Sequence, residues 1–469
     1  MKNIAEEIKQ WKIKNLDAKS PSFCGAKWYN TSIWLYSGQT TSCHHNPPHT
    51  IDIDAIKINP MAMHNTPIKK NERRMMQLGE KPKNCQFCWV MEEVEPDGLA
   101  DRTWMSRGAT EDQLDTAFNN SFEHDYDVTY LEIGFDRTCN LACSYCEPAI
   151  STTWAKDIRK NGPYENLQTD KRNHYTSTKD NFVLYDFNDH NPYADAFFKW
   201  WDTSLHKTIK HLRITGGEPM MSGHTWKLLD WLADNPNKSD CRIDMTTNLS
   251  YDHDTLMRFL DKCSKIDQPM TLATSSESIG AKDEYIRDGL DWNLWQENLV
   301  KILSSGVIKN TGICTTISAA AADGFAEFLY WIFELKKQWP RQALMVSVNP
   351  VRFPTFQNIS VLPQNLRDMY SDEIDEFLSQ PLVDKYFHTI EIDHITRFSA
   401  YLRTVKSPHS ETALQHNNDQ FTSSQNNDIG QALLEKDFKQ FFTQYDQRRG
   451  KDFVSTFPRL KNWYESIQL

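Results

Sequence analysis

The chain has 469 residues, of which 39% are hydrophobic and 25% charged, and this length allows two or three domains with sizeable cores. Glycine is scarce, at 17 residues, which excludes a fibrous or low-complexity protein. The formal net charge of −11 excludes a broad basic surface of the kind that binds duplex nucleic acid tightly, so we do not expect a nucleic-acid partner.

The first sixteen residues, MKNIAEEIKQWKIKNL, form a charged amphipathic stretch without an apolar core, so they do not predict a signal peptide. No stretch reaches the roughly 18 consecutive apolar residues that predict a transmembrane helix. We therefore expect a cytoplasmic protein without a membrane partner, in a compartment where thiols stay reduced. Its ten cysteines are then expected to be metal ligands or core residues, and not a disulfide framework.

The first cysteines lie in and after a stretch with hairpin signals. Residues 23–47 contain the partly alternating WYNTSIWLY, the turn SG and the returning QTTSC. Residues 81–93, KPKNCQFCWVMEE, add a C-x2-C pair. Four thiolates can saturate either a zinc ion or an iron–sulfur cluster, and the residues alone leave both open. The four are Cys24, Cys43, Cys85 and Cys88, with His44 and His45 as alternative ligands.

A group of three cysteines follows a predicted strand. The β-branched and aromatic residues of TYLEIGF (129–135) are typical of a buried strand, and STTWAKDIRK (151–160) predicts a helix entered through Ser/Thr caps. Between them lie Cys139, Cys143 and Cys146, at a strand end where α/β proteins place active sites. Three thiolates cannot close a tetrahedral zinc site, but they suit three corners of an iron–sulfur cubane whose fourth iron stays open.

A glycine-rich turn follows the next predicted strand, HLRIT at 211–215. Glycines there let backbone carbonyls approach a ligand closely, and a Glu carboxylate suits an ammonium partner. The turn consists of Gly216, Gly217, Glu218 and Pro219. Further strands, each followed by a helix or turn, are predicted within 241–250, 270–289, 310–337 and 342–354. Six β–α units in succession predict a parallel sheet.

The C-x3-C-x2-C spacing, with Tyr145 directly before the last cysteine, and the GGEP turn on the second strand resemble the radical S-adenosylmethionine (SAM) superfamily. The resemblance implies a partial (β/α)6 barrel, a 4Fe-4S cluster on the three cysteines, and SAM bound to the open iron. It implies that the GGEP turn holds the methionine amino group of SAM. It also implies reductive cleavage of SAM, hydrogen abstraction from a substrate, and an electron donor such as flavodoxin or ferredoxin.

The same resemblance extends to residues of the third and fourth strands. Ser275 and Glu277 match the Ser and the acid that contact the ribose of SAM, although a Glu stands where the usual Ser-x-Asp has an Asp. Asn248 and Arg287 match polar positions near SAM. Ordinary strand-end capping is the alternative role for Asn248, Ser275 and Arg287.

The four earlier cysteines resemble the twitch or SPASM-type auxiliary module of radical SAM enzymes. The matching features are FC before an aromatic strand, a strand–turn–strand, the second cysteine, and C-x2-C ahead of acidic residues. Such a module usually follows the barrel, whereas here it precedes it. The resemblance implies a second iron–sulfur cluster, with zinc as the alternative, and a peptide or protein substrate.

The sequence thus predicts an α/β protein in three parts. These are an N-terminal cysteine module at 1–126, a partial barrel at 127–355 with a polar insertion at about 161–192, and a helical C-terminal extension at 356–469. The predicted function is that of a radical SAM enzyme acting on a peptide, protein or small molecule. The alternatives are an RNA- or nucleotide-modifying radical SAM enzyme and a non-catalytic zinc or iron–sulfur binding protein.

Overall fold

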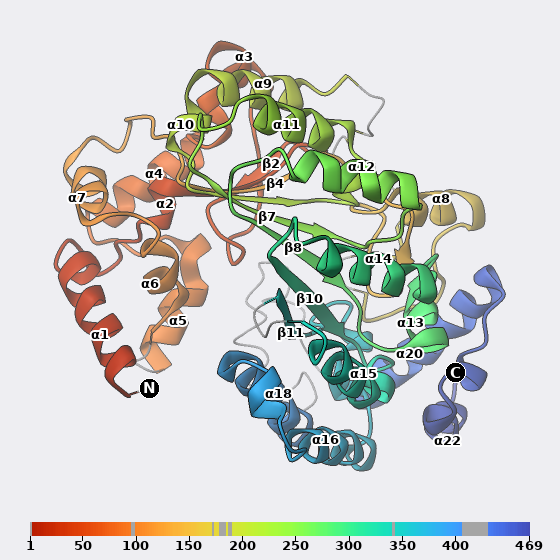
Figure 1. Ribbon diagram of the computed structural model, residues 1–469. Helices are drawn as coiled ribbons and strands as arrows, with labels where there is room; N and C mark the ends of the chain where they lie inside the picture. The colour runs from red at the N-terminus through yellow and green to blue at the C-terminus, as the bar shows by residue number, and fades with distance from the viewer. Residues whose placement is uncertain are drawn as a thin grey trace.

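The computed structural model describes residues 2–94, 99–170, 173–177, 184–185, 190–339, 343–405 and 430–469. A nine-stranded sheet lies at its centre, in the order β11-β10-β8-β7-β6-β4-β1-β2-β3 (Figure 1). Six strands pair in parallel in chain order, which confirms the predicted α/β class. Their bounds are β4 (Tyr130–Gly134), β6 (His211–Thr215), β7 (Arg242–Thr247), β8 (Met270–Ser275), β10 (Asn310–Ile317) and β11 (Leu344–Pro350). Among the described residues the sheet keeps two edges, β11 and β3, so the barrel is not closed.

Amphipathic helices cover the outer face of these strands (Figure 1). Burial alternates along the strands: in β6, Leu212 and Ile214 are buried, whereas Arg213 between them stays half-exposed on the inner face. Five of these helices begin at side-chain caps, as polar residues at helix starts predict; the caps are Ser151, Asn191, Ser222, Asp252 and Asp291. The connecting helices are α8 (Thr152–Asn161), α9 (Pro192–Trp200), α11 (Gly223–Asp234), α12 (His253–Cys263), α14 (Trp292–Ser305) and α15 (Ala322–Lys336).

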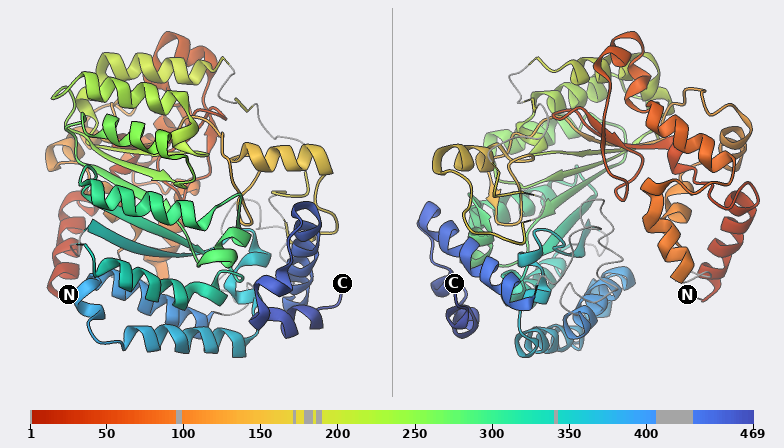
Figure 2. Two further views of the ribbon diagram at one scale, coloured as in Figure 1. Left: turned by 45° about the vertical axis from the view of Figure 1, so that its right-hand side comes forward. Right: turned by 180° about the vertical axis from the view of Figure 1, so that it is seen from behind.

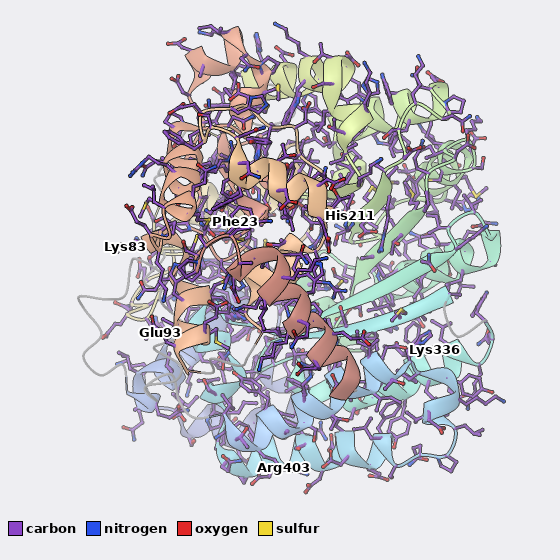
Figure 3. All side chains as sticks on the ribbon, turned by 90° about the vertical axis from the view of Figure 1, so that its left-hand side faces the viewer. Phe23, Lys83, Glu93, His211, Lys336 and Arg403 are labelled. Atoms are coloured by element: carbon purple, nitrogen blue, oxygen red, sulfur yellow. The ribbon has the colours of Figure 1, made fainter. Side chains whose placement is uncertain are left out.

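The N-terminal part continues the barrel sheet. Strand β1 (Asn30–Trp34) pairs in parallel with β4 and antiparallel with β2 (Gln39–Thr41), and β2 pairs with β3 (His49–Thr50). The N-terminal part also contains a second hydrophobic cluster, which includes Trp28 and Phe23; Phe23 is labelled in Figure 3. Its helices include α2 (Ala26–Tyr29), α4 (Pro67–Gln77), α5 (Gln86–Val94), α6 (Asp101–Ser106) and α7 (Glu111–Asn119). Residues 1–126 therefore have their own core but share one sheet with the barrel.

The C-terminal extension is helical, as predicted, with α16 (Gln364–Leu378), α18 (Thr389–Thr404) and α20 (Gln431–Arg449). Helix α20 lies on the opposite side of the molecule from the N-terminal helices (Figure 2). Helix α18 covers the β11 edge, because the buried Glu391 accepts hydrogen bonds from Val346 N at 2.8 Å and pairs with Lys336 at 3.0 Å. None of the described helices is both long and apolar enough to cross a membrane.

The insertion at 161–192 is only partly described, over 161–170, 173–177, 184–185 and 190–192. Although polar in sequence, it buries two tyrosines, Tyr164 and Tyr175, whose rings contact Trp154 of α8 and Phe441 of α20. Asp437 of α20 accepts hydrogen bonds from the backbone of the insertion. The described part of the insertion thus packs against the C-terminal extension.

Candidate functional site

One cavity, of about 240 Å³, lies where the parallel strands end, at the edge where α/β folds bind ligands. Loops after five strands contribute to it. Its lining consists of Cys139, Leu141, Cys143, Tyr145, Cys146, Ile150, Gly216, Gly217, Glu218, Thr246, Thr247, Asn248, Ser275, Arg287 and Thr316. The fold therefore brings together the three clustered cysteines and most of the residues predicted to surround them. Pro219 and Glu277 lie outside this lining.

The cysteine loop is held by backbone contacts. Short strand β5 (Ala142–Cys143) pairs with β9 (Arg287–Asp288). The amide of Cys146 donates to Cys143 O at 2.9 Å, and the indole of Trp154 donates to the same carbonyl at 2.9 Å. The backbone N–H of Leu141 points at the sulfur of Cys139, 3.5 Å away. These contacts fix the loop so that its three sulfurs border one cavity.

Two distant segments support the loop from behind. The buried Ser144 O accepts hydrogen bonds from Tyr175 of the insertion and from Gln357, each at 2.8 Å. From α20, the hydroxyl of Tyr445 donates to Ala142 O at 3.3 Å. Sequence reasoning missed all three residues, because a lone Tyr or Gln at a large sequence separation carries no motif. The insertion and the extension therefore help to position the cysteine loop.

Burial disfavours the thiolate form of all three clustered cysteines. Burial raises the pKa of Cys139 to about 12 and that of Cys143 to about 11, and it raises the pKa of Cys146 well above its ordinary value. The nearby guanidinium of Arg287 opposes the shift at Cys143. Because a metal ligand must be a thiolate, binding of a cationic metal centre would release protons here.

The glycine turn is a point of close chain approach. Gly216 has φ +119°, and a Cβ on it would lie 2.9 Å from Asp136 O. A Cβ on Gly217 would lie 2.4 Å from Thr138 O. The turn docks on the cysteine loop through the amide of Glu218, which donates to Thr138 O at 2.6 Å. Only glycine permits this packing, so these residues are needed for the shape of the cavity as well as for access to a ligand.

Glu218 is buried and hydrogen-bonded to the end of β7. Its Oε1 accepts from the hydroxyl of Thr247 at 2.8 Å and from the hydroxyl of Tyr251 at 2.5 Å, and Met220 N donates to it at 3.0 Å. Its Oε2 accepts from Asn248 N at 2.6 Å. Burial raises the pKa of this carboxyl, while the four donors oppose the shift. Glu218 thus joins the ends of β6 and β7; its contact with a ligand ammonium stays a prediction.

Glu277 is held by the protein on every side. Arg287 donates to it through Nε at 2.8 Å and Nη2 at 2.9 Å, and Tyr145 donates its hydroxyl at 2.8 Å. Thr316 N adds a bond at 3.1 Å. Glu277 is fully buried, whereas Ser275 lines the cavity. The predicted ribose contact of both residues remains a prediction, and Ser275 has the better access.

Asn248 lies beside the cysteines. Its amide nitrogen is 3.9 Å from the sulfur of Cys139 and donates to Asn140 Oδ1 at 2.7 Å. The Nη1 of Arg287 is 3.5 Å from the sulfur of Cys143. Two side chains that the sequence placed near a cofactor thus contact the sulfurs themselves.

The four N-terminal cysteines line a second cavity, which we call the four-cysteine chamber. Cys24, Cys43, Cys85 and Cys88 border it together with Lys27, Asn46, Asp101 and Arg102, among others. A tetrahedral zinc ion would hold its sulfurs about 3.8 Å apart. Within the described ranges, no three cysteine sulfurs lie within 4.8 Å of one another. Each group therefore contains at least one pair of sulfurs that is farther apart than the sulfurs of a zinc site.

Polar groups contact the sulfurs of the chamber. Asn46 bridges two of them, since Cys43 Sγ donates to its Oδ1 at 2.9 Å and its Nδ2 donates to Cys85 Sγ at 3.6 Å. The hydroxyl of Ser106 is 3.8 Å from Cys24 Sγ. Burial raises the pKa of Cys85 to about 12, and the ammonium of Lys27 opposes that shift.

The two histidines after Cys43 meet Asp101 at the chamber. Nε2 of His45 contacts the Asp101 carboxylate closely, and Nε2 of His44 lies 3.5 Å from it. The ring of His45 stacks on Phe87, with centroids 3.6 Å apart. Of the two histidines, His45 lines the four-cysteine chamber, whereas His44 is largely exposed and does not.

No family model matches this chain. Over 257 residues, 54% of its length, it is 21% identical to a GTP 3′,8-cyclase of Campylobacter lari, and it spans 63% of that protein, which is less than two thirds. Among solved structures it is similar to Streptococcus suis SuiB bound to the precursor peptide SuiA, with TM-score 0.33, 13% identity and coverage of 77% of this chain and 71% of that chain. It is also similar to native anSMEcpe with bound AdoMet and Kp18Cys peptide, with TM-score 0.32, 13% identity and coverage of 52% and 58%. The sequence similarity to the cyclase supports the superfamily resemblance.

Proposed function

We propose that this chain is a radical SAM enzyme. The observation that carries the proposal is a single cavity lined by Cys139, Cys143 and Cys146 together with the glycine turn after the next strand. A zinc or iron–sulfur scaffold would explain the cysteines, but it would not need this turn docked beside them with an open cavity between. The glycine turn and the half-open cavity therefore favour an enzyme over a non-catalytic binding protein.

The residues present fit a 4Fe-4S cluster with one open iron. The three thiols supply three soft ligands, and they are spaced too widely for a zinc ion. When bound, the reduced cluster supplies the electron that cleaves SAM to methionine and a 5′-deoxyadenosyl radical, which abstracts hydrogen from the substrate. Asn248 and Arg287 place N–H groups against the sulfurs of Cys139 and Cys143, and Ser275 borders the space left for SAM.

Anaerobic reconstitution with iron and sulfide tests this proposal. We expect the reconstituted protein to convert SAM to 5′-deoxyadenosine after reduction by dithionite, as measured by liquid chromatography with mass spectrometry. The proposal would be contradicted if the reconstituted protein binds iron at Cys139, Cys143 and Cys146 but forms no 5′-deoxyadenosine. A flavodoxin or ferredoxin is the proposed physiological electron donor.

We further propose that the four-cysteine chamber holds a second 4Fe-4S cluster that relays electrons. The four thiols would ligate every iron, so this centre would leave no position for SAM. The wide spacing of the sulfurs supports a cluster over zinc. Cations at the chamber also support an anionic centre, since Lys27 lines it and is almost fully buried.

The proposed substrate is a peptide or protein, the class implied by the resemblance of the N-terminal cysteines to an auxiliary module. A nucleotide is the second candidate, because the similar curated protein is a GTP 3′,8-cyclase. Incubation of the reduced enzyme with GTP and SAM separates the two. A product derived from GTP would establish the nucleotide, whereas unchanged GTP together with a mass shift on a host peptide would establish the peptide.

A further inference from the structure

A buried cation paired with a carboxylate stands beside both cysteine sites. At the first site Arg287 pairs with Glu277 next to Cys143. At the four-cysteine chamber the pair is Lys27 with Glu72, whose side chains are only 3% and 6% exposed. Burying an ion pair costs desolvation free energy that apolar residues of similar size would avoid, so a functional reason for these pairs should be sought.

The two members of the N-terminal pair are placed unequally. Lys27 lines the chamber, whereas Glu72 does not. Asn84 donates to Glu72 Oε1 at 2.8 Å and so helps to fix this carboxylate. The buried carboxylate of Glu72 contacts the Lys27 ammonium closely, which favours the charged form of Lys27 at the chamber wall.

The other cation on the chamber wall is already neutralised. Arg102 donates to Glu92 at 2.6 Å and to Asp17 at 2.7 Å. Lys12 contacts the same two carboxylates, so two cations and two carboxylates balance there. Asp101 lies at the same wall and is 39% exposed, in contact with the histidines. Lys27 is thus the buried cation of this wall whose carboxylate partner lies outside the chamber lining.

We propose that Lys27 is the electrostatic counter-charge of the metal centre in the chamber and raises its reduction potential, with Glu72 as the positioning residue. The inference rests on the auxiliary cluster of the proposed function. Reduction adds one electron, and thus one negative charge, to a centre that four thiolates already make anionic. A fixed ammonium in a poorly solvated site stabilises the reduced form more than the oxidised form.

The test uses the full-length chain with Cys139, Cys143 and Cys146 replaced by alanine, so that iron can enter only the chamber. A dithionite titration followed by electron paramagnetic resonance gives the midpoint potential. Lys27→Met is expected to lower the equilibrium constant for reduction at least tenfold, which corresponds to a shift of about −59 mV in the midpoint potential for one electron. Glu72→Gln removes the opposing carboxylate and should shift the potential upward. Lys83→Met is the matched control, because it removes an exposed lysine two residues before Cys85 and solvent screens that charge.

The two variants are expected to shift the midpoint potential in opposite directions, and this separates an electrostatic role from a merely structural one. If Lys27 and Glu72 only hold the fold, both variants lose iron and neither moves the potential of the cluster that remains, which would overturn the inference. Shifts in the same direction would overturn it as well. A parent protein that binds no iron in the chamber would refute the auxiliary cluster itself. If the parent protein binds about four irons and neither substitution changes its midpoint potential, only the role of Lys27 is refuted.

Discussion

The Nη1 of Arg287 lies 3.5 Å from the sulfur of Cys143, while the other two nitrogens of the same guanidinium grip Glu277. One buried side chain thus connects the strand end that carries Glu277 to the loop that carries the cysteines. Because Tyr145 also donates to Glu277, the cysteine loop is tied to this ion pair at two points. The geometry of the proposed cluster site therefore depends on a charge pair that no motif of the cysteines contains.

Removing either partner of this pair alone should be costly. Arg287→Met leaves Glu277 fully buried without its cation, so we expect the free energy of unfolding to fall by about 3–5 kcal/mol. The double variant with Glu277→Gln should lose less than the sum of the two single variants. Urea unfolding of the metal-free protein under anaerobic conditions measures all three. Strict additivity would mean that the two side chains do not interact.

The three clustered cysteines should each be required for SAM cleavage. Cys139→Ala, Cys143→Ala and Cys146→Ala are each expected to abolish 5′-deoxyadenosine formation, because every thiolate holds one iron of an open cubane. Cys263→Ala is the control, since Cys263 is buried at the end of α12, away from the cavity. Normal cleavage by any of the three variants would rule out the cluster assignment, and loss of cleavage in the control would point to instability.

Local patterns in the sequence predicted the barrel strands and most of the cavity. Each of the six strands is a short segment that contains β-branched residues, and recognising such segments needs no long-range information. The cysteine spacing and the GGEP turn are equally local. The pairing of β1 with β4 was not predicted, because it joins residues about a hundred positions apart and depends on the whole fold.

Roles that depend on side-chain partners were harder to predict. Glu277 was expected at the ribose of SAM, which stays a prediction; the sequence did not reveal the three protein residues that bond to it, of which Arg287 is the main one. Tyr175 lies in a polar stretch, so composition favoured a surface position, but its ring is buried and its hydroxyl reaches Ser144. A single aromatic residue in a loop does not reveal in sequence what it will contact.

Glu218 should matter through the shape of the site as well as through any contact with SAM. Glu218→Ala removes an acceptor with four donors, so we expect both the stability and the SAM affinity of reconstituted protein to fall. Tyr251→Phe removes one of those bonds and should cost about 1.5–3 kcal/mol of stability, the range for a bond to a charged group.

Tyr251 lies outside the cavity lining, which makes it the useful comparison. If Glu218 acts on SAM only by positioning the turn, Tyr251→Phe should weaken SAM binding in the same direction and by less than Glu218→Ala. Equilibrium dialysis of SAM with both variants decides the matter. Unchanged affinity in Glu218→Ala would show that the turn needs no acidic residue to hold SAM.

The stability of the protein should fall as the pH rises through neutrality, owing to Asp283. Burial, with the charge of Glu277 nearby, raises the pKa of Asp283 from 3.8 to about 7. Because the folded-state pKa is raised, the contribution of this group is fully present below its unfolded pKa and is lost as the pH rises through 7. Asp283→Asn cannot titrate, and its Oδ1 can still accept from the amides of Glu277 and Ser278.

The stability of Asp283→Asn relative to the natural chain should therefore increase by about 1.4 kcal/mol per pH unit between pH 5 and 7. Urea unfolding of both metal-free proteins at several pH values gives this difference directly. Parallel pH profiles would mean that the pKa of Asp283 is the same in the folded and unfolded states, and that outcome would contradict the prediction.

The last prediction concerns the metal in the four-cysteine chamber. Replacing Cys85 and Cys88 together removes two of its four ligands, so the iron content of anaerobically reconstituted protein should fall by roughly half, as one of two cubanes is lost. Cleavage of SAM without substrate should persist, because Cys139, Cys143 and Cys146 are unchanged. Formation of product should fail if the second cluster relays electrons. Metal analysis of the natural chain sharpens the test, since about four irons with one tightly held zinc would refute the second cluster. We do not expect zinc, because the cysteine sulfurs would have to move closer together to bind it. Within the described part of the chain, no three of them lie within 4.8 Å of one another.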